Sequence, residues 1–175
     1  MKKIMSLALV CMLLFCLCAC DFEPTLVGTT PVQQSDAAPS SNSKTFQLGD
    51  VVELSDVTVG FVDVVTSTGS DFNKPQEGNI FVLCEFEITN NSSEELAVSS
   101  MLSFEAYCDG YSTSLSLQAL MEKGSRNQLD GSVAAGKKMK GVVGYEVPAE
   151  WEELEVHYTI DLLHGNKIVF VAGNK

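Results

Sequence analysis

The chain has few of the residues on which enzymes and metal sites depend. Its 175 residues include two histidines, His157 and His164, and one tryptophan. A zinc site needs three or four His or Cys ligands, often in close pairs, and here such a set would form only by coincidence of folding. No G-x-S-x-G sequence marks a nucleophilic serine, and a hydrolytic triad would need Ser, His and an acid to converge in the fold. The sequence therefore predicts a non-catalytic protein with no metal and no cofactor.

Basic residues are also scarce, with 11 Lys and Arg against 23 Asp and Glu, so the formal net charge is −12. A charge of this size repels nucleic acid and anionic lipid headgroups. The composition thus excludes nucleic acid as a partner and favours a soluble domain surface.

Only one apolar run is long, and it lies at the N-terminus. It extends from Ile4 to Ala19, with Ser6 as its one polar residue, and follows the basic start Met1-Lys2-Lys3. A transmembrane helix needs about 20 apolar residues, so the run is short for one. A basic start, a short apolar segment and a small residue at its end are typical of a secretory signal peptide.

The tetrapeptide Leu17-Cys18-Ala19-Cys20 resembles the lipobox of bacterial lipoproteins. Cys20 alone among the N-terminal cysteines follows a small residue. The resemblance implies that the Cys20 thiol takes a diacylglyceryl group and that residues 1–19 are then removed. Acyl burial contributes about 0.8 kcal/mol per methylene, and two chains give stable anchoring. We expect the chain to be anchored to the membrane through lipid at Cys20, with its domain on the extracytoplasmic face. The alternative is an uncleaved N-terminal anchor.

The processed chain divides by composition into a linker, 20–44, and a domain, 45–175. Loss of Lys2 and Lys3 leaves nine basic residues against 23 acidic ones, a net charge of −14. The linker is rich in Ser, Thr, Pro and Gln and has few large apolar residues, which predicts disorder. A flexible coil of this length reaches roughly 25–30 Å.

From Thr45 onward, short β-branched and aromatic runs recur between Gly, Asn, Asp and Ser. Alternation over residues 79–89 puts Ile80, Val82, Cys84, Phe86 and Ile88 on one face of a strand, and residues 57–65 alternate similarly at first. Further strands are predicted at 96–108, 111–117, 136–147, 154–163 and 168–172, with a helical turn or loop at 118–130. Asp109-Gly110 and residues 165–166 are turn signals.

This pattern predicts an all-β domain of seven or eight strands. Such a count favours two packed antiparallel sheets, an immunoglobulin-like sandwich, with a closed barrel as the alternative.

Two segments carry a resemblance to a known family. "GNIFVLCEFEITNNSSEELAVSSMLSFEAY" and "VAAGKKMKGVVGYEVP" are similar to the strand, turn and strand and to the later Val-Pro strand end of the telokin-like, immunoglobulin-fold domain of bacterial lipoproteins. Order and spacing agree over roughly residues 46–172. The family is one of unknown function, so the resemblance implies a fold and no catalytic residues.

Cys84 and Cys108 are the two cysteines of the predicted domain. Outside the cytoplasm they could form a disulfide, and closing a loop of this length would contribute roughly 3 kcal/mol. The alternative is two buried free thiols. A weak calcium site at Asp71, Asn73 and Glu77 is conceivable, but a solvated loop is favoured.

Two charged clusters have structural explanations that we favour over ligand binding. Acidic residues at 150–155 surround Trp151, which we expect to cover the end of the core. Three lysines, Lys137, Lys138 and Lys140, suit an edge strand, where lysine discourages edge-to-edge pairing.

These features predict a surface lipoprotein with a non-catalytic binding or interaction domain, whose ligand is an unknown protein or cell-envelope component. The loops at 66–78 and 118–130 are the expected recognition surfaces. A cell-envelope hydrolase and a structural accessory of an envelope complex are the alternatives.

Overall fold

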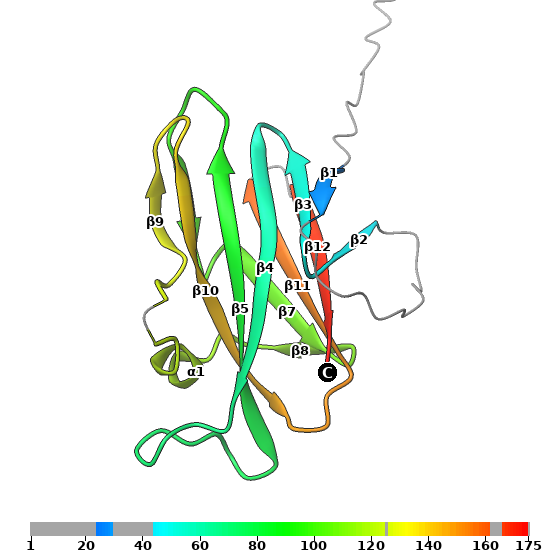
Figure 1. Cartoon of the computed structure of the whole chain (residues 1–175), viewed down its shortest axis with the longest axis vertical. Coiled ribbons are helices and arrows are strands. Elements are labelled where there is room, and N and C mark those ends of the chain that lie inside the picture. Colours follow the sequence, from blue (N-terminus) through cyan, green and yellow to red (C-terminus); the bar gives the residue numbers. More distant parts are fainter. Residues whose placement is uncertain (1–23, 30–43, 125, 162–165, 175) are drawn as a thin grey trace, which may run out of the picture.

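The computed structural model describes residues 24–29, 44–124, 126–161 and 166–174, which form two five-stranded sheets packed face to face. In Figure 1 the strands of the first sheet lie in front of those of the second. The first sheet has the order β1 (Thr25–Thr29), β3 (Asp50–Leu54), β4 (Val57–Ser67), β5 (Asn79–Asn90) and β10 (Lys138–Pro148). The second has the order β2 (Thr45–Gln47), β12 (Asn166–Gly173), β11 (Glu153–Asp161), β7 (Phe104–Cys108) and β8 (Tyr111–Thr113).

A third, small sheet pairs β6 (Leu96–Ser99) with β9 (Asp130–Val133), and the one helix of the described residues is α1 (Leu117–Met121). Within the described part of the chain, no helix is both long enough and apolar enough to cross a membrane.

The core between the sheets follows the alternation in the sequence. On β5, Val82, Cys84, Phe86 and Ile88 are all buried, and β4 contributes Phe61, whose ring stacks on Phe86 with centroids 4.7 Å apart. Burying each large apolar side chain contributes about 1.5–3 kcal/mol. The predicted β-sandwich is therefore confirmed at the level of two main sheets around one core.

The strand inventory differs from the prediction of seven or eight. The described residues form twelve strands, because β1, β2, β3 and β9 lie outside the predicted ranges and the predicted strand 96–108 is two strands, β6 and β7. A turn in which Ser103 N donates to Ser99 O at 2.8 Å separates these two. Pairing is also not wholly antiparallel, since β2 runs parallel to β12.

The predicted linker contains a strand that composition did not indicate. Thr25–Thr29 pairs antiparallel with β3 as β1, although Leu26 and Val27 are about half exposed. Backbone hydrogen bonds to the edge of β3, rather than side-chain burial, hold this segment. Residues 1–23, which include the predicted signal peptide and Cys20, lie outside the described residues.

Helix α1 covers the outer face of the first sheet at one end. Ser116 caps its N-terminus, because its side chain accepts from Ala119 N at 3.1 Å. Below the helix, Leu83, Val142 and Leu120 form a small apolar cluster. The helix packs against β10 at Gly144, where an added Cβ would lie 3.0 Å from Ala119 Cβ.

Candidate functional site

The two loops predicted to be recognition surfaces meet at one end of the sandwich. Asn73, in the connection between β4 and β5, is buried, and its side-chain amide donates to Gln118 O at 2.9 Å and to Glu122 Oε1 at 2.5 Å. This contact joins the connection to α1, at the lower end of Figure 1, whereas β1 lies toward the upper end. The weak calcium site considered from the sequence falls on this connection, where the Asn73 amide nitrogen is bound to α1 and Asp71 and Glu77 are exposed.

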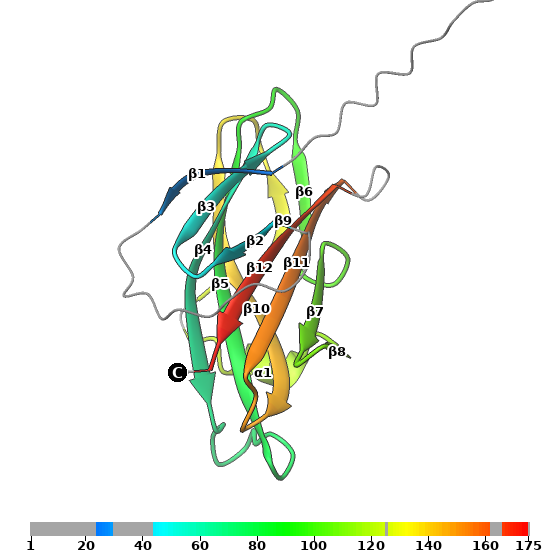
Figure 2. The same ribbon diagram turned by 90° about the vertical axis from the view of Figure 1, so that its right-hand side faces the viewer.

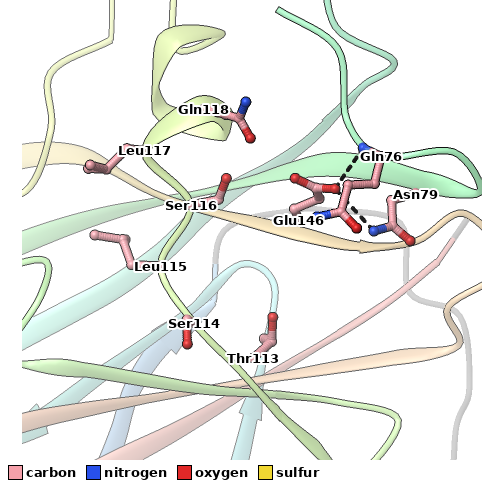
Figure 3. A pocket seen from close by; sticks show the side chains of 9 residues that line it. All are labelled: Gln76, Asn79, Thr113, Ser114, Leu115, Ser116, Leu117, Gln118 and Glu146. Carbon is pink, nitrogen blue, oxygen red and sulfur yellow. Dashed lines mark hydrogen bonds between the residues drawn. The ribbon is translucent and has the colours of Figure 1, made fainter.

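Beside this contact, Glu146 on β10 fixes one wall of an open hollow of about 490 Å³. Its Oε1 accepts from Gln76 N at 2.8 Å and from Asn79 Nδ2 at 3.0 Å. Figure 3 shows Glu146 grouped with these two residues, and the segment 113–118 forms the rest of the lining. The lining residues are Gln76, Asn79, Thr113, Ser114, Leu115, Ser116, Leu117, Gln118 and Glu146.

A second hollow of about 360 Å³ adjoins the first, since Thr113 and Glu146 line both. It lies between β8 and the end of β10, and its lining adds Cys108, Asp109, Tyr111, Ser112, Val147 and Pro148. We call the two hollows together the β8 groove. β8 is the last strand of the second sheet, and Figure 2 places it at the outer edge of the molecule.

The charged side chains that line the β8 groove are all acidic. Neither hollow is lined by Lys, Arg or His, whereas Glu146 and Asp109 contribute carboxylates. The Asp109 carboxylate accepts from the backbone N–H groups of Glu153 and Glu152, and these bonds hold the pKa of Asp109 below its ordinary value. The groove therefore offers hydrogen-bond acceptors and negative charge at neutral pH.

The two cysteines of the domain are free and buried. Cys84 lies in β5 of the first sheet and Cys108 in β7 of the second, and both are free thiols in the structure. Burial, reinforced by the charge of Asp63, raises the pKa of Cys84 far above the ordinary range. Burial and the nearby Asp109 carboxylate raise the pKa of Cys108 to about 11.

Trp151 and His157, both considered in the sequence analysis, pack against other side chains of the sandwich. Trp151 is 2% exposed and belongs to the core, as predicted. His157 lies on the outer face of β11, half-buried against the ring of Tyr107 at 5.1 Å, with Nε2 3.1 Å from Glu155 Oε2. His164 lies outside the described residues.

Two of the three predicted edge lysines form ion pairs on the outer face of the first sheet. Lys138 lies 2.9 Å from Glu87, and Lys140 lies 3.5 Å from Glu85. β10 is the edge strand, as expected. The residues before and after α1 hydrogen-bond to that edge, with Ser116 N donating to Gly144 O at 2.8 Å.

Within the described ranges, no group of three or more His, Cys, Asp or Glu side chains is placed to hold a metal ion. Sequence reasoning missed Glu146, Gln76 and Asn79. Glu146 did carry a weak signal, because it is the one charged residue in the apolar stretch from Gly141 to Val147.

Comparison with solved structures establishes the fold. The chain is similar to a protein of Bacillus subtilis described as a "putative lipoprotein" (ycdA), at 20% identity and a TM-score of 0.57 over 68% of this chain and 37% of that one. It therefore spans little more than a third of that relative. It is also similar to the yjhA protein of Bacillus subtilis, at 14% identity and a TM-score of 0.57 over 71% of this chain and 97% of that one.

At the level of sequence, no curated protein matches the chain. The model of one family, the domain of unknown function DUF4352, matches residues 46–168. The matched range contains β3 to β11, α1 and the whole of the β8 groove, whereas β1 lies before it and most of β12 after it.

Proposed function

We propose that this chain, which belongs to the DUF4352 family, is a bacterial surface lipoprotein whose sandwich is a non-catalytic, extracytoplasmic binding domain. One observation carries the binding role: Asn73 joins the two long loops beside the β8 groove, away from the end of the sandwich that carries β1. The lipid anchor is supported by Leu17-Cys18-Ala19-Cys20 and by the description of ycdA. We also propose that the sandwich is a telokin-like, immunoglobulin-fold domain of the kind found in bacterial lipoproteins.

The position of β1 suggests how an anchored domain would face. Only residues 21–24 separate Cys20 from Thr25, the first residue of β1. An extended chain spans at most about 3.3–3.6 Å per residue, so a paired β1 would keep its end of the sandwich within about 20 Å of a lipidated Cys20. The α1 end and the β8 groove would then face away from the membrane, where a ligand is accessible.

The chemistry of the groove supports binding rather than catalysis. A hydrolase needs an activated nucleophile beside a general base, and no imidazole lines the groove. The one thiol there, Cys108, is buried with its pKa raised to about 11, so little thiolate is present at neutral pH. The Ser116 hydroxyl accepts from Ala119 N in capping α1.

The anchor is tested by Cys20→Ala in cells fed an alkyne-bearing fatty acid. We expect the unchanged chain to take up the label and to run as the shorter, processed form, and the variant to do neither. The same substitution at Cys18 is the matched control and should retain label. Label persisting on Cys20→Ala would overturn the lipoprotein assignment.

The binding role is tested by photo-crosslinking on intact cells. A benzophenone amino acid replaces Ser114, which is exposed in the groove, and as a control replaces Glu95, which is exposed between β5 and β6 at the opposite end. We expect an adduct from position 114 and none from position 95. Failure at position 114, together with turnover of a wall polymer by the purified chain, would favour the hydrolase.

A structural accessory of an envelope complex is the second candidate, because apolar side chains are exposed near α1. Phe72 is 100% exposed, and Leu117 and Met121 are each more than 60% exposed. Under this alternative, Phe72→Ser would abolish co-purification of a large complex while leaving the adduct at position 114 unchanged.

A further inference from the structure

We propose that the β8 groove binds an extended peptide that adds as a strand to the free edge of β8 and places a basic side chain against Glu146. The inference rests on the proposed function as a binding domain and specifies its ligand class. Three properties of the groove support it: its place at a sheet edge, its lack of cations, and the arrangement of hydrogen bonds around Glu146.

The first property is backbone pairing. β8 pairs with β7 through Ala106 with Thr113, Tyr107 with Ser112 and Cys108 with Tyr111, and no described strand pairs with its other side. The free edge of a strand presents unpaired N–H and C=O groups that a second extended chain can satisfy. Two of the three β8 side chains are exposed: Tyr111 is 80% exposed, and Ser112 is also exposed.

The groove follows this edge. Both hollows include Thr113, so they continue past the end of β8 from Tyr111 on one side to Ser114–Gln118 on the other. Their volumes of about 490 and 360 Å³ each suit a few side chains or backbone units. Two adjoining hollows beside a strand edge fit a linear ligand better than a compact one.

The second property is charge. Because the lining contains Glu146 and Asp109 and no Lys, Arg or His, anionic ligands such as phosphates or acidic peptides are disfavoured. The whole chain carries a net charge of −12, which adds to the attraction of a cation. Complementarity thus selects a ligand with basic side chains.

The third property is the orientation of Glu146. Its Oε1 is occupied by Gln76 N and Asn79 Nδ2, which hold the carboxylate in place. Within the described residues, Oε2 makes no hydrogen bond, so one oxygen of a fixed carboxylate is free to accept from a ligand. A lysine or arginine side chain meets this requirement with a charge-assisted bond.

The test uses the full chain purified in a non-ionic detergent and fluorescein-labelled acetyl-(Lys-Thr)4-amide, with binding followed by fluorescence anisotropy at physiological salt. We expect Glu146→Gln to weaken binding about tenfold. Glu77→Gln is the matched control: Glu77 is exposed, follows Gln76 directly and lines neither hollow, so the same change in net charge should alter affinity less than twofold. Equal losses from the two variants would show non-specific attraction and overturn the proposal.

Strand addition is tested with two N-methylated versions of the peptide, one methylated at the odd residues and one at the even residues. Successive N–H groups of a strand point to opposite sides, so only one version blocks pairing with β8. We expect one version to lose binding and the other to bind as the unmethylated peptide does. Equal behaviour of the two versions would overturn strand addition.

Chitotetraose, a neutral saccharide, separates the remaining ligand class. Binding of chitotetraose that is weakened by Glu146→Gln, with no binding of the basic peptide, would overturn the peptide inference. The binding domain itself would stand in that case, and also where the photo-crosslinker at position 114 captures an adduct while the peptide fails to bind.

Discussion

The packing of α1 on β10 gives a sharp test of the structure, through Gly144→Ala. A Cβ at Gly144 would lie 3.0 Å from Ala119 Cβ, 3.1 Å from Leu120 N and 3.2 Å from Leu83 Cδ2. These contacts come from both sides, since Ala119 and Leu120 belong to the helix and Leu83 to the neighbouring strand β5. One methyl group therefore has to displace either the helix or the sheet.

The helix cannot move away freely, because the chain is tied to β10 directly before it. Ser116 N donates to Gly144 O at 2.8 Å, and Leu115 forms a bridge with Tyr145. Overpacking of a core position costs about 1–3 kcal/mol, and we expect Gly144→Ala to reduce the free energy of unfolding by that amount. For a chain of this size, each kcal/mol corresponds to a decrease of roughly 2–4 °C in Tm.

Gly60→Ala is the matched control. Gly60 is also buried, lies in β4, and has Val51 Cγ2 at 3.6 Å as the nearest atom to an added Cβ, an ordinary contact distance. Replacing a strand glycine by alanine recovers about 0.5–1 kcal/mol where the Cβ fits. The two substitutions are chemically identical and should have opposite effects on stability.

Urea unfolding followed by tryptophan fluorescence measures both variants. Trp151 is the one tryptophan and is buried in the core, so its emission reports loss of the sandwich. We expect a lower midpoint for Gly144→Ala, an equal or higher midpoint for Gly60→Ala, and an unchanged m-value. Equal midpoints for the two variants would refute the packing of α1 on Gly144.

Three further predictions follow from buried or hydrogen-bonded groups. Asn90→Ala should cost about 1–3 kcal/mol in urea unfolding, because the buried Asn90 amide donates to Glu94 O at 2.7 Å and Val133 O at 2.8 Å, whereas the exposed Asn91→Ala should have little effect. In a Cys20→Ser background, Ellman's reagent at pH 8 should leave Cys84 and Cys108 unmodified in the native domain, since burial raises both pKa values. After denaturation without reductant, the reagent should detect both thiols. If it detects neither thiol after denaturation, the two cysteines form a disulfide. Backbone hydrogen bonds from Glu153 and Glu152 lower the pKa of Asp109, so its contribution to stability is complete above the unfolded pKa of about 3.9 and is lost as the pH falls through the lower folded pKa. The thermal unfolding of Asp109→Asn should therefore depend less on pH below about 4 than that of the unchanged chain. An unchanged acid dependence would contradict this assignment.

Asn90 makes both a local contact, which the sequence predicts, and a long-range contact, which it does not. The sequence Thr89-Asn90-Asn91-Ser92 is part of the resemblance to a known family, and it predicts a turn after a strand. In the structure, Asn90 Oδ1 accepts from Ser92 N at 3.0 Å, which forms the turn. The amide of the same residue reaches Val133 O, and this contact ties the turn to β9, a link that the sequence does not reveal.

Alternation within single strands was enough to predict strands with one buried face, and their number favoured a sandwich, with a closed barrel as the alternative. Period-two alternation is a property of neighbouring residues, so β5 and β11 could be predicted without knowledge of their partners. Residues 141–145 of β10 are all buried, so this strand was predicted from its apolar run and from Pro148 at its end. The lipobox resemblance at Cys20 is likewise local and needs no fold.

Which strand edges are free and which loops meet depends on contacts between segments far apart in the sequence. The pairing of β1 with β3 depends on backbone groups, which carry no side-chain signal, and the Asn73 contact joins positions 45 residues apart. The β8 groove exists because β8 and β10 end their sheets on the same side of the sandwich, which brings Thr113 and Glu146 together. Sheet order is set by the packing of the whole core, and for this reason no short segment of the sequence could indicate the groove.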